Sequence, residues 1–74
     1  MNQTVDEAEF LVFLRRQFDM GDELSLDTRL AELEQWDSLA MVMFVANVDA
    51  EYNAAVDGNA VAQAETVRDL YGLV

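Results

Sequence analysis

The sequence predicts an all-α protein, a small four-helix bundle of three main helices and a short third helix, with a long loop between helices 1 and 2. Apolar residues recur at helical three- and four-residue spacing in several segments. Residues that favour helix starts (Thr, Asp and Ser) stand before these segments. The chain is 53% hydrophobic and has no Cys, so it must fold by packing alone.

The first helix is predicted from about Thr4 to Phe18. Its apolar stripe consists of Val5, Ala8, Leu11, Val12, Leu14 and Phe18. Thr4 and Glu7 fit a capping box, in which each side chain binds the other residue's backbone amide. Acidic residues lie near the positive end of the helix dipole and Arg15 and Arg16 near its negative end. Gly21 marks the end of the helix or the start of the loop.

Residues 19–36 are predicted to form the long loop, with a short helical turn near Thr28 to Glu32. Turn-favouring residues are frequent here, namely Asp22, Ser25, Asp27 and Thr28. Four leucines can anchor the segment to a core, namely Leu24, Leu26, Leu30 and Leu33. Loops of this length are uncommon in compact domains and are often functional.

The second strong helix is predicted from about Ser38 to Tyr52, with Asp37 as its N-cap. The segment from Leu39 to Val48 reads LAMVMFVANV, and Asn47 is its only polar residue. A helix that is apolar on nearly every side is either buried or has a second apolar face for something else.

The remainder is predicted as a connector and two further helices. Asn53 to Asn59 is the connector, with Asp57-Gly58-Asn59 as its turn. An Ala-rich stretch from Ala60 to Ala64 forms the short helix. Thr66 then serves as an N-cap with Asp69 three residues on, and the last helix repeats Val67, Leu70, Tyr71 and Val74 at helical spacing.

Length and charge limit the possible functions. The 74 residues are expected to form one domain, residues 1–74. The net charge of −11 disfavours nucleic acid and anionic membranes as partners. It either favours a partner with a basic patch or simply keeps the protein soluble. The longest apolar run, Leu39 to Ala46, is shorter than the roughly 20 residues that span a bilayer, and the acidic amino terminus lacks the basic region of a signal peptide. We therefore expect a cytoplasmic protein, and we expect it to be a monomer.

Catalytic and metal-binding side chains are scarce. The chain has no His, Cys or Lys, so a Ser/His or Cys/His catalytic pair cannot exist. The acidic stretches do not match calcium-loop spacing, and we predict no metal site. The sequence therefore predicts a protein that is not an enzyme.

The tripeptide Asp37-Ser38-Leu39 carries the functional prediction, although Asp-Ser at a helix start is ordinary by itself. The stretch from Leu30 to Ala40 resembles the modification site of acyl carrier proteins and peptidyl carrier domains. The resemblance covers almost the whole chain. Its other matching positions are Val42, Phe44, Val45, Val48, Tyr52, Val56, Thr66, Val67 and Leu70.

The resemblance implies that Ser38 receives a 4′-phosphopantetheine arm from coenzyme A. The implied partners are a phosphopantetheinyl transferase, an acyl- or aminoacyl-loading ligase and downstream acyl-processing enzymes. By the same resemblance Asp37 assists the transferase through its metal ion, and it can also be a plain N-cap. The composition agrees, because a chain without Cys, His or Lys must import the thiol for thioesters and the base that deprotonates Ser38.

Two features depart from the family pattern. Gln35 and Trp36 stand where many members have Gly, and we expect Trp36 to pack rather than to shape the surface around the arm. Ala40, Met43 and Ala50 replace carboxylates on the outer face of the second helix. We therefore expect a partly apolar docking face with an acidic rim, made of Leu39, Met41, Val42, Met43, Ala46 and Asp49. In the alternative, the Met residues belong to the core.

The expected function is a discrete acyl or aminoacyl carrier that holds thioesters on the arm at Ser38. The departures favour a specialised lipid, polyketide or secondary-metabolite pathway over housekeeping fatty-acid biosynthesis. The cargo, and whether it enters the helical core, stay open. The alternative is an unmodified acidic helical adaptor for a basic partner, in which Ser38 is only a cap whose loss costs about 1 kcal/mol.

Overall fold

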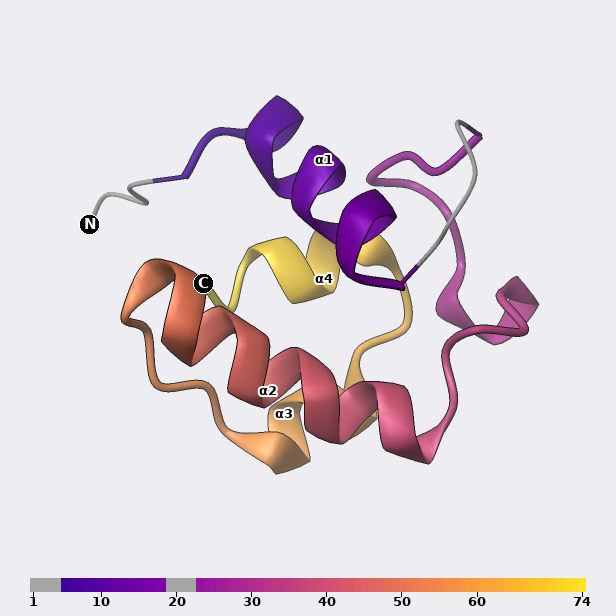
Figure 1. Cartoon of the computed structure of the whole chain (residues 1–74). Helices are drawn as coiled ribbons and strands as arrows, with labels where there is room; N and C mark the ends of the chain where they lie inside the picture. Colours follow the sequence, from indigo (N-terminus) through magenta and orange to yellow (C-terminus); the bar gives the residue numbers. More distant parts are fainter. Residues whose placement is uncertain (1–4, 19–22) are drawn as a thin grey trace.

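The computed structural model describes residues 5–18 and 23–74 as a set of short helices around one core (Figure 1). The elements are α1 (Glu7–Phe18), the 3-10 helix η1 (Leu30–Glu32), α2 (Ser38–Tyr52), α3 (Gly58–Gln63) and α4 (Val67–Tyr71). In Figure 1, α2 lies between α1 above and α3 below, with α4 behind it. The predicted all-α bundle is confirmed, and no helix within the described ranges is long and apolar enough to cross a membrane.

The core is aromatic at its centre. Phe10 of α1 and Phe44 of α2 are fully buried, and their rings meet edge to face at 6.2 Å. Phe13 also contacts Phe44, at 6.4 Å. Such pairs add to the stability that burial of apolar area provides. The hydroxyl of Tyr71 donates to the Val5 carbonyl at 2.8 Å, which ties the C-terminal helix to the segment before α1.

The helix α1 begins later than predicted. Its first helical residue is Glu7. The Asp6 side chain accepts a hydrogen bond from a backbone amide of the first turn, because the Glu9 amide donates to Asp6 Oδ1 at 2.8 Å. The predicted capping box needs Thr4, which lies outside the described residues, as do Gly21 and Asp22. The predicted end at Phe18 is confirmed.

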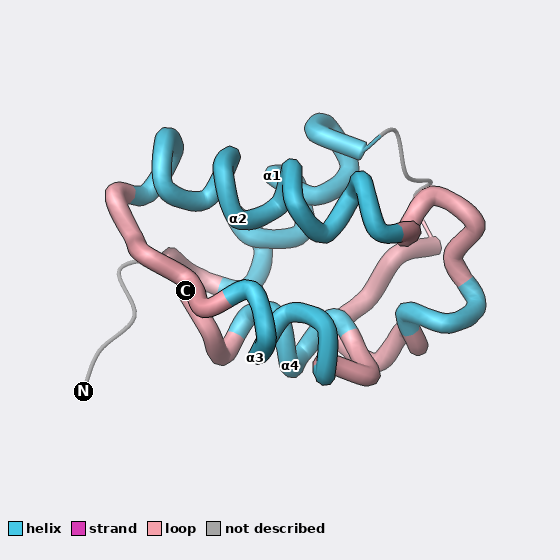
Figure 2. Tube along the Cα trace, turned by 90° about the horizontal axis from the view of Figure 1, so that it is seen from below, coloured by secondary structure: helices cyan, strands magenta, loops and turns pink. Residues whose placement is uncertain are grey.

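The described part of the connection between α1 and α2, residues 23–37, is fixed to the rest of the molecule (Figure 2). Three of its four leucines are buried and the fourth is half-buried, so the predicted anchors are confirmed. The predicted helical turn near Thr28 to Glu32 is the 3-10 helix η1.

The backbone of this connection also pairs with the start of α4. The Val67 amide donates to the Thr28 carbonyl at 3.0 Å, and the Arg68 amide donates to the Leu26 carbonyl at 2.8 Å. The first amides of a helix have no partner within the helix. Here the loop satisfies two of them, so it is a structural part of the bundle.

The helix α3 begins at Gly58, earlier than predicted. The tripeptide Asp57-Gly58-Asn59 is a helix start rather than a turn in the connector, because Asp57 is the N-cap and its side chain accepts from the Asn59 amide at 3.0 Å. Asn53 closes α2 in the left-handed conformation, with φ of 55°. The predicted N-cap of α4 is confirmed, and Thr66 forms a full capping box with Asp69.

Candidate functional site

Ser38 is the first residue of α2 and is exposed to solvent. The start of α2 lies at the edge of the molecule, where the long connection enters the helix (Figure 1). No other described residue forms a hydrogen bond with the Ser38 side chain. Its hydroxyl is therefore available to a partner from solution.

Asp37 is the N-cap of α2, as predicted. Its Oδ1 accepts from the Ala40 amide at 2.9 Å, and its carbonyl accepts from the Met41 amide at 3.0 Å. The N-cap of α2 is therefore Asp37 and not Ser38, which is the first residue of the helix. The positive end of the helix dipole lies beside Ser38, and negative charge is stabilised there.

Trp36 holds the residues before the site in place. Its ring is 8% exposed and meets Phe18 at 5.9 Å and Phe44 at 5.7 Å, both edge to face. The Trp36 amide donates to the Leu33 carbonyl at 3.1 Å, which closes the turn before Asp37. The prediction that Trp36 packs is confirmed. Its indole Nε1 is buried without a hydrogen-bond acceptor among residues 5–18 and 23–74.

The apolar helix α2 has one buried and one exposed face. Ala40, Phe44 and Val48 are buried at four-residue spacing. The prediction that Ala40 belongs to the outer face is therefore wrong, because it shares the inner face with Phe44.

The exposed face is also apolar. Leu39 is 66% exposed, Val42 is 67% exposed and Met43 is 42% exposed. Ala46 and Asp49 are exposed, whereas Met41 is half-buried and packs against the core. The two methionines thus differ, and only Met43 lies mainly on the outside.

The side chains at this site can accept a group but offer little chemistry of their own. The chain has no His, Cys or Lys to deprotonate the Ser38 hydroxyl. Within the described parts of the chain, no group of three or more acidic, His or Cys residues could hold a metal ion. A hydroxyl that is exposed at a helix N-terminus fits a phosphodiester, because the helix dipole favours the added negative charge.

An acidic helical domain with such a hydroxyl agrees with the class of carrier domains, which bear a substrate for other enzymes. The chain matches the family described as "Phosphopantetheine attachment site" over residues 9–74, and it belongs to this family. The covalently bound prosthetic group of the family is phosphopantetheine. Its domains are generally non-catalytic carriers that meet a phosphopantetheinyl transferase and acyl-processing enzymes. No curated protein and no solved structure matches the chain.

Proposed function

We propose that the chain is a discrete carrier protein that holds acyl or aminoacyl groups as thioesters on a 4′-phosphopantetheine arm at Ser38. The observation that carries this proposal is the exposed and unengaged Ser38 hydroxyl at the start of α2. Residues 1–74 act as one domain and work as a cytoplasmic monomer in this proposal.

Asp37 supports the proposal with a second role beside capping. Only its Oδ1 is hydrogen-bonded within the described structure, to the Ala40 amide. The other carboxylate oxygen is left to bind the metal ion of a transferase beside the Ser38 hydroxyl. The base that deprotonates Ser38 comes from the transferase, because this chain has none to offer.

The docking face for partner enzymes consists, in this proposal, of Leu39, Val42, Met43 and Ala46, with Met41 at its inner edge and Asp49 on its rim. The first four recur at three- and four-residue spacing and so share one side of α2. No residue from Ser38 to Val48 is ionisable. A partner that docks here meets apolar side chains, which favours dedicated enzymes of a specialised lipid, polyketide or secondary-metabolite pathway.

The test is an intact-mass measurement on the unmodified protein with coenzyme A and a broad-specificity transferase. We expect one mass increase of a phosphopantetheine group, and none with Ser38→Ala. Asp37→Asn is the matched variant, since Asn also caps helices. It should keep the fold and slow the modification. Wild type that stays unmodified with several transferases would leave the acidic adaptor as the function, which the net charge of −11 favours.

A further inference from the structure

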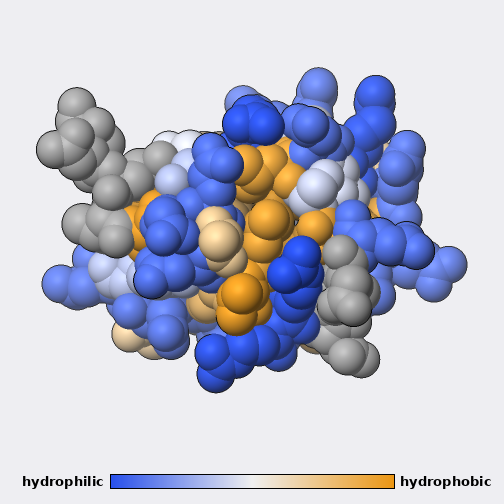
Figure 3. All heavy atoms as spheres, turned by 90° about the horizontal axis from the view of Figure 1, so that it is seen from above, coloured by the Kyte–Doolittle hydropathy of each residue, from blue (hydrophilic) through white to orange (hydrophobic). Residues whose placement is uncertain are grey.

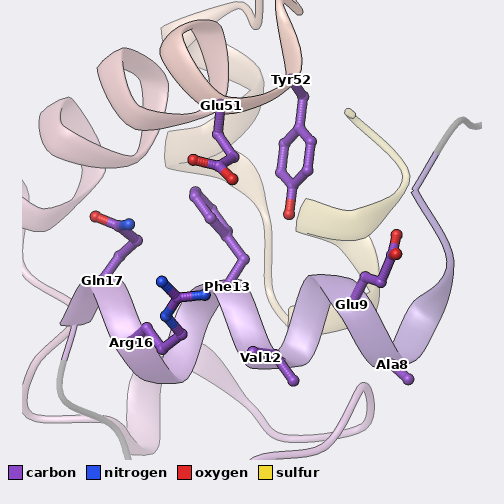
Figure 4. Close-up of a pocket in the computed structure, with 8 residues that line it drawn as sticks. All are labelled: Ala8, Glu9, Val12, Phe13, Arg16, Gln17, Glu51 and Tyr52. Atoms are coloured by element: carbon purple, nitrogen blue, oxygen red, sulfur yellow. The ribbon is translucent and has the colours of Figure 1, made fainter.

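A groove separate from Ser38 lies between α1 and the last turn of α2 (Figure 4). Its volume is about 420 Å³, within the range of about 300–1,000 Å³ that is usual for binding pockets. The residues that line it are Ala8, Glu9, Val12, Phe13, Arg16, Gln17, Glu51 and Tyr52.

Part of the inner surface of the groove is apolar. The rings of Phe13 and Tyr52 lie 5.1 Å apart and form a continuous aromatic wall between the two helices. Val12 is 44% exposed, although it is a large aliphatic residue. Figure 3 shows hydrophobic side chains gathered at the centre of the face that α1 covers, with hydrophilic side chains around them.

The mouth of the groove holds ionised side chains without partners. Within the described residues, no hydrogen bond or ion pair engages the side chains of Glu9, Arg16 and Glu51. The mouth therefore carries two carboxylates and one guanidinium, and the balance of charge is negative.

Burial and these charged groups change the pKa of the Tyr52 hydroxyl. Burial raises the pKa of Tyr52, and the carboxylates of Glu51 and Glu9 raise it further, while Arg16 lowers it. The two carboxylates that disfavour a phenolate here favour a cation near the same place.

We propose that this groove is a second docking site, for a segment of a partner protein that presents a large aliphatic side chain next to Lys or Arg. The aliphatic side chain would cover Val12 and the aromatic wall, and the cation would face Glu9 and Glu51. Arg16 at the mouth would bind a backbone carbonyl of the segment. The net charge of −11 attracts such a segment toward the molecule.

The groove and Ser38 lie at opposite ends of α2. Ser38 is its first residue and Tyr52 its last, so about 21 Å of helix separates them at the usual rise. A partner held in the groove leaves Ser38 free to reach other enzymes. The site would thus anchor the protein, and it does not depend on modification of Ser38.

The experiment is an NMR titration of the unmodified, ¹⁵N-labelled protein with acetyl-leucyl-arginine amide. We expect saturable shifts of the backbone amides of α1 and of the last turn of α2. The matched probe, acetyl-leucyl-glutamate amide, should leave these amides in place. Salt should weaken the binding, because the mouth of the groove is exposed.

Variants separate the groove from general attraction to an acidic protein. Glu9→Gln and Glu51→Gln should each weaken the binding about two- to fivefold, as expected for exposed ion pairs. The control variant Glu65→Gln removes the same charge outside the groove and should leave the binding of the probe unchanged. The amide spectrum of each variant reports that it is folded. Ser38→Ala should bind the probe like wild type, so this result is independent of the attachment site.

Three outcomes would overturn the proposal. The first is that the amide shifts spread over the whole acidic surface and that Glu65→Gln weakens the binding of the probe as much as Glu51→Gln does. The second is no saturable shift at the groove. The third is a change in the same amides with protein concentration in the absence of the probe, which would assign the groove to a second copy of the chain.

Discussion

At the scale of single residues, Trp36 links the proposed attachment site to the core. It directly precedes Asp37 and Ser38, and its ring lies against Phe18 of α1 and Phe44 of α2. The position of the Ser38 hydroxyl therefore depends on a side chain that is itself held by two helices.

Replacing Trp36 should destabilise the fold in a graded way. Trp36→Ala should cost about 3–5 kcal/mol, which is a large part of the about 5–15 kcal/mol of a typical domain. Trp36→Phe should cost less, because it keeps a ring between the two aromatic neighbours and the lost Nε1 has no acceptor within the described structure. Denaturant unfolding followed by circular dichroism measures both. A Trp36→Ala protein as stable as wild type would show that the ring contributes little to the core.

At the scale of elements, one face of α2 belongs to the core and the other is exposed to solvent. The inner face packs around Phe44, and the outer face exposes Leu39, Val42 and Met43. The outer face is where we propose that an enzyme docks, because contacts there leave the core undisturbed.

Met43→Glu tests the outer face. Because Met43 is 42% exposed, the substitution should change the free energy of unfolding by less than about 1 kcal/mol. It should slow the transfer of phosphopantetheine to the chain about fivefold or more, the effect of losing about 1 kcal/mol of contact. Ala62→Glu, at an exposed position on α3, adds the same charge elsewhere and should load normally. Equal rates of phosphopantetheine transfer to both variants would show that Met43 is not part of the docking face.

The N-terminus of α4 should make stability depend on pH. The backbone amides of Glu65 and Thr66 donate to Asp69 Oδ2 at 2.9 and 3.2 Å and hold the pKa of Asp69 below its usual value. A carboxyl with a lowered folded pKa stabilises the fold above its unfolded pKa of about 4, and this contribution is lost as pH falls through the folded pKa. Asp69→Asn should therefore be less stable than wild type at neutral pH, and the difference should shrink below about pH 4. A difference that is constant with pH would contradict this.

The sequence predicts best those elements whose ends have one strong capping residue. Asp37 and Tyr52 bound α2 as predicted, and Thr66 starts the capping box of α4 as predicted. The start of α1 was less certain, since Asp6 is as good a cap as Thr4. At α3, Asp57 could begin either a turn or a helix, and short-range preferences do not decide between them.

Contacts between distant residues could not be predicted from the sequence. The groove brings Glu9 and Arg16 of α1 next to Tyr52 of α2, and no motif marks that meeting. The proposed role of Ser38 can be inferred from the sequence, because it rests on a local motif that resembles a known family and on the missing catalytic side chains. The burial of Ala40 was missed because α2 is apolar on both faces, so hydrophobicity alone does not show which side is inner.

At the scale of the whole molecule, uncompensated negative charge is the main feature. The structure shows one ion pair in the described ranges, between Arg68 and Asp27 at 3.2 Å, and both side chains are largely exposed. Exposed pairs of this kind contribute little. Most of the charge of −11 therefore repels itself within a molecule 29 Å long.

Salt should stabilise this protein. Raising the ionic strength from about 0.01 M to about 1 M shortens the screening length from about 30 Å to about 3 Å, which is far less than the size of the molecule. If screening relieves about 1 kcal/mol of repulsion, Tm should rise by about 4–8 °C. Thermal melts in NaCl measure this. A Tm that falls with salt would mean that attractive pairs outweigh the repulsion.

The pairing of Val67 and Arg68 with the carbonyls of Thr28 and Leu26 has a consequence for how the molecule opens. A five-residue helix such as α4 is too short to persist alone, because helix nucleation is costly. It keeps its shape only while the long connection is docked against it, so the two form one cooperative unit. That connection runs directly into Ser38. A partner that binds beside Ser38 and pulls this connection away from the bundle would therefore also loosen α4.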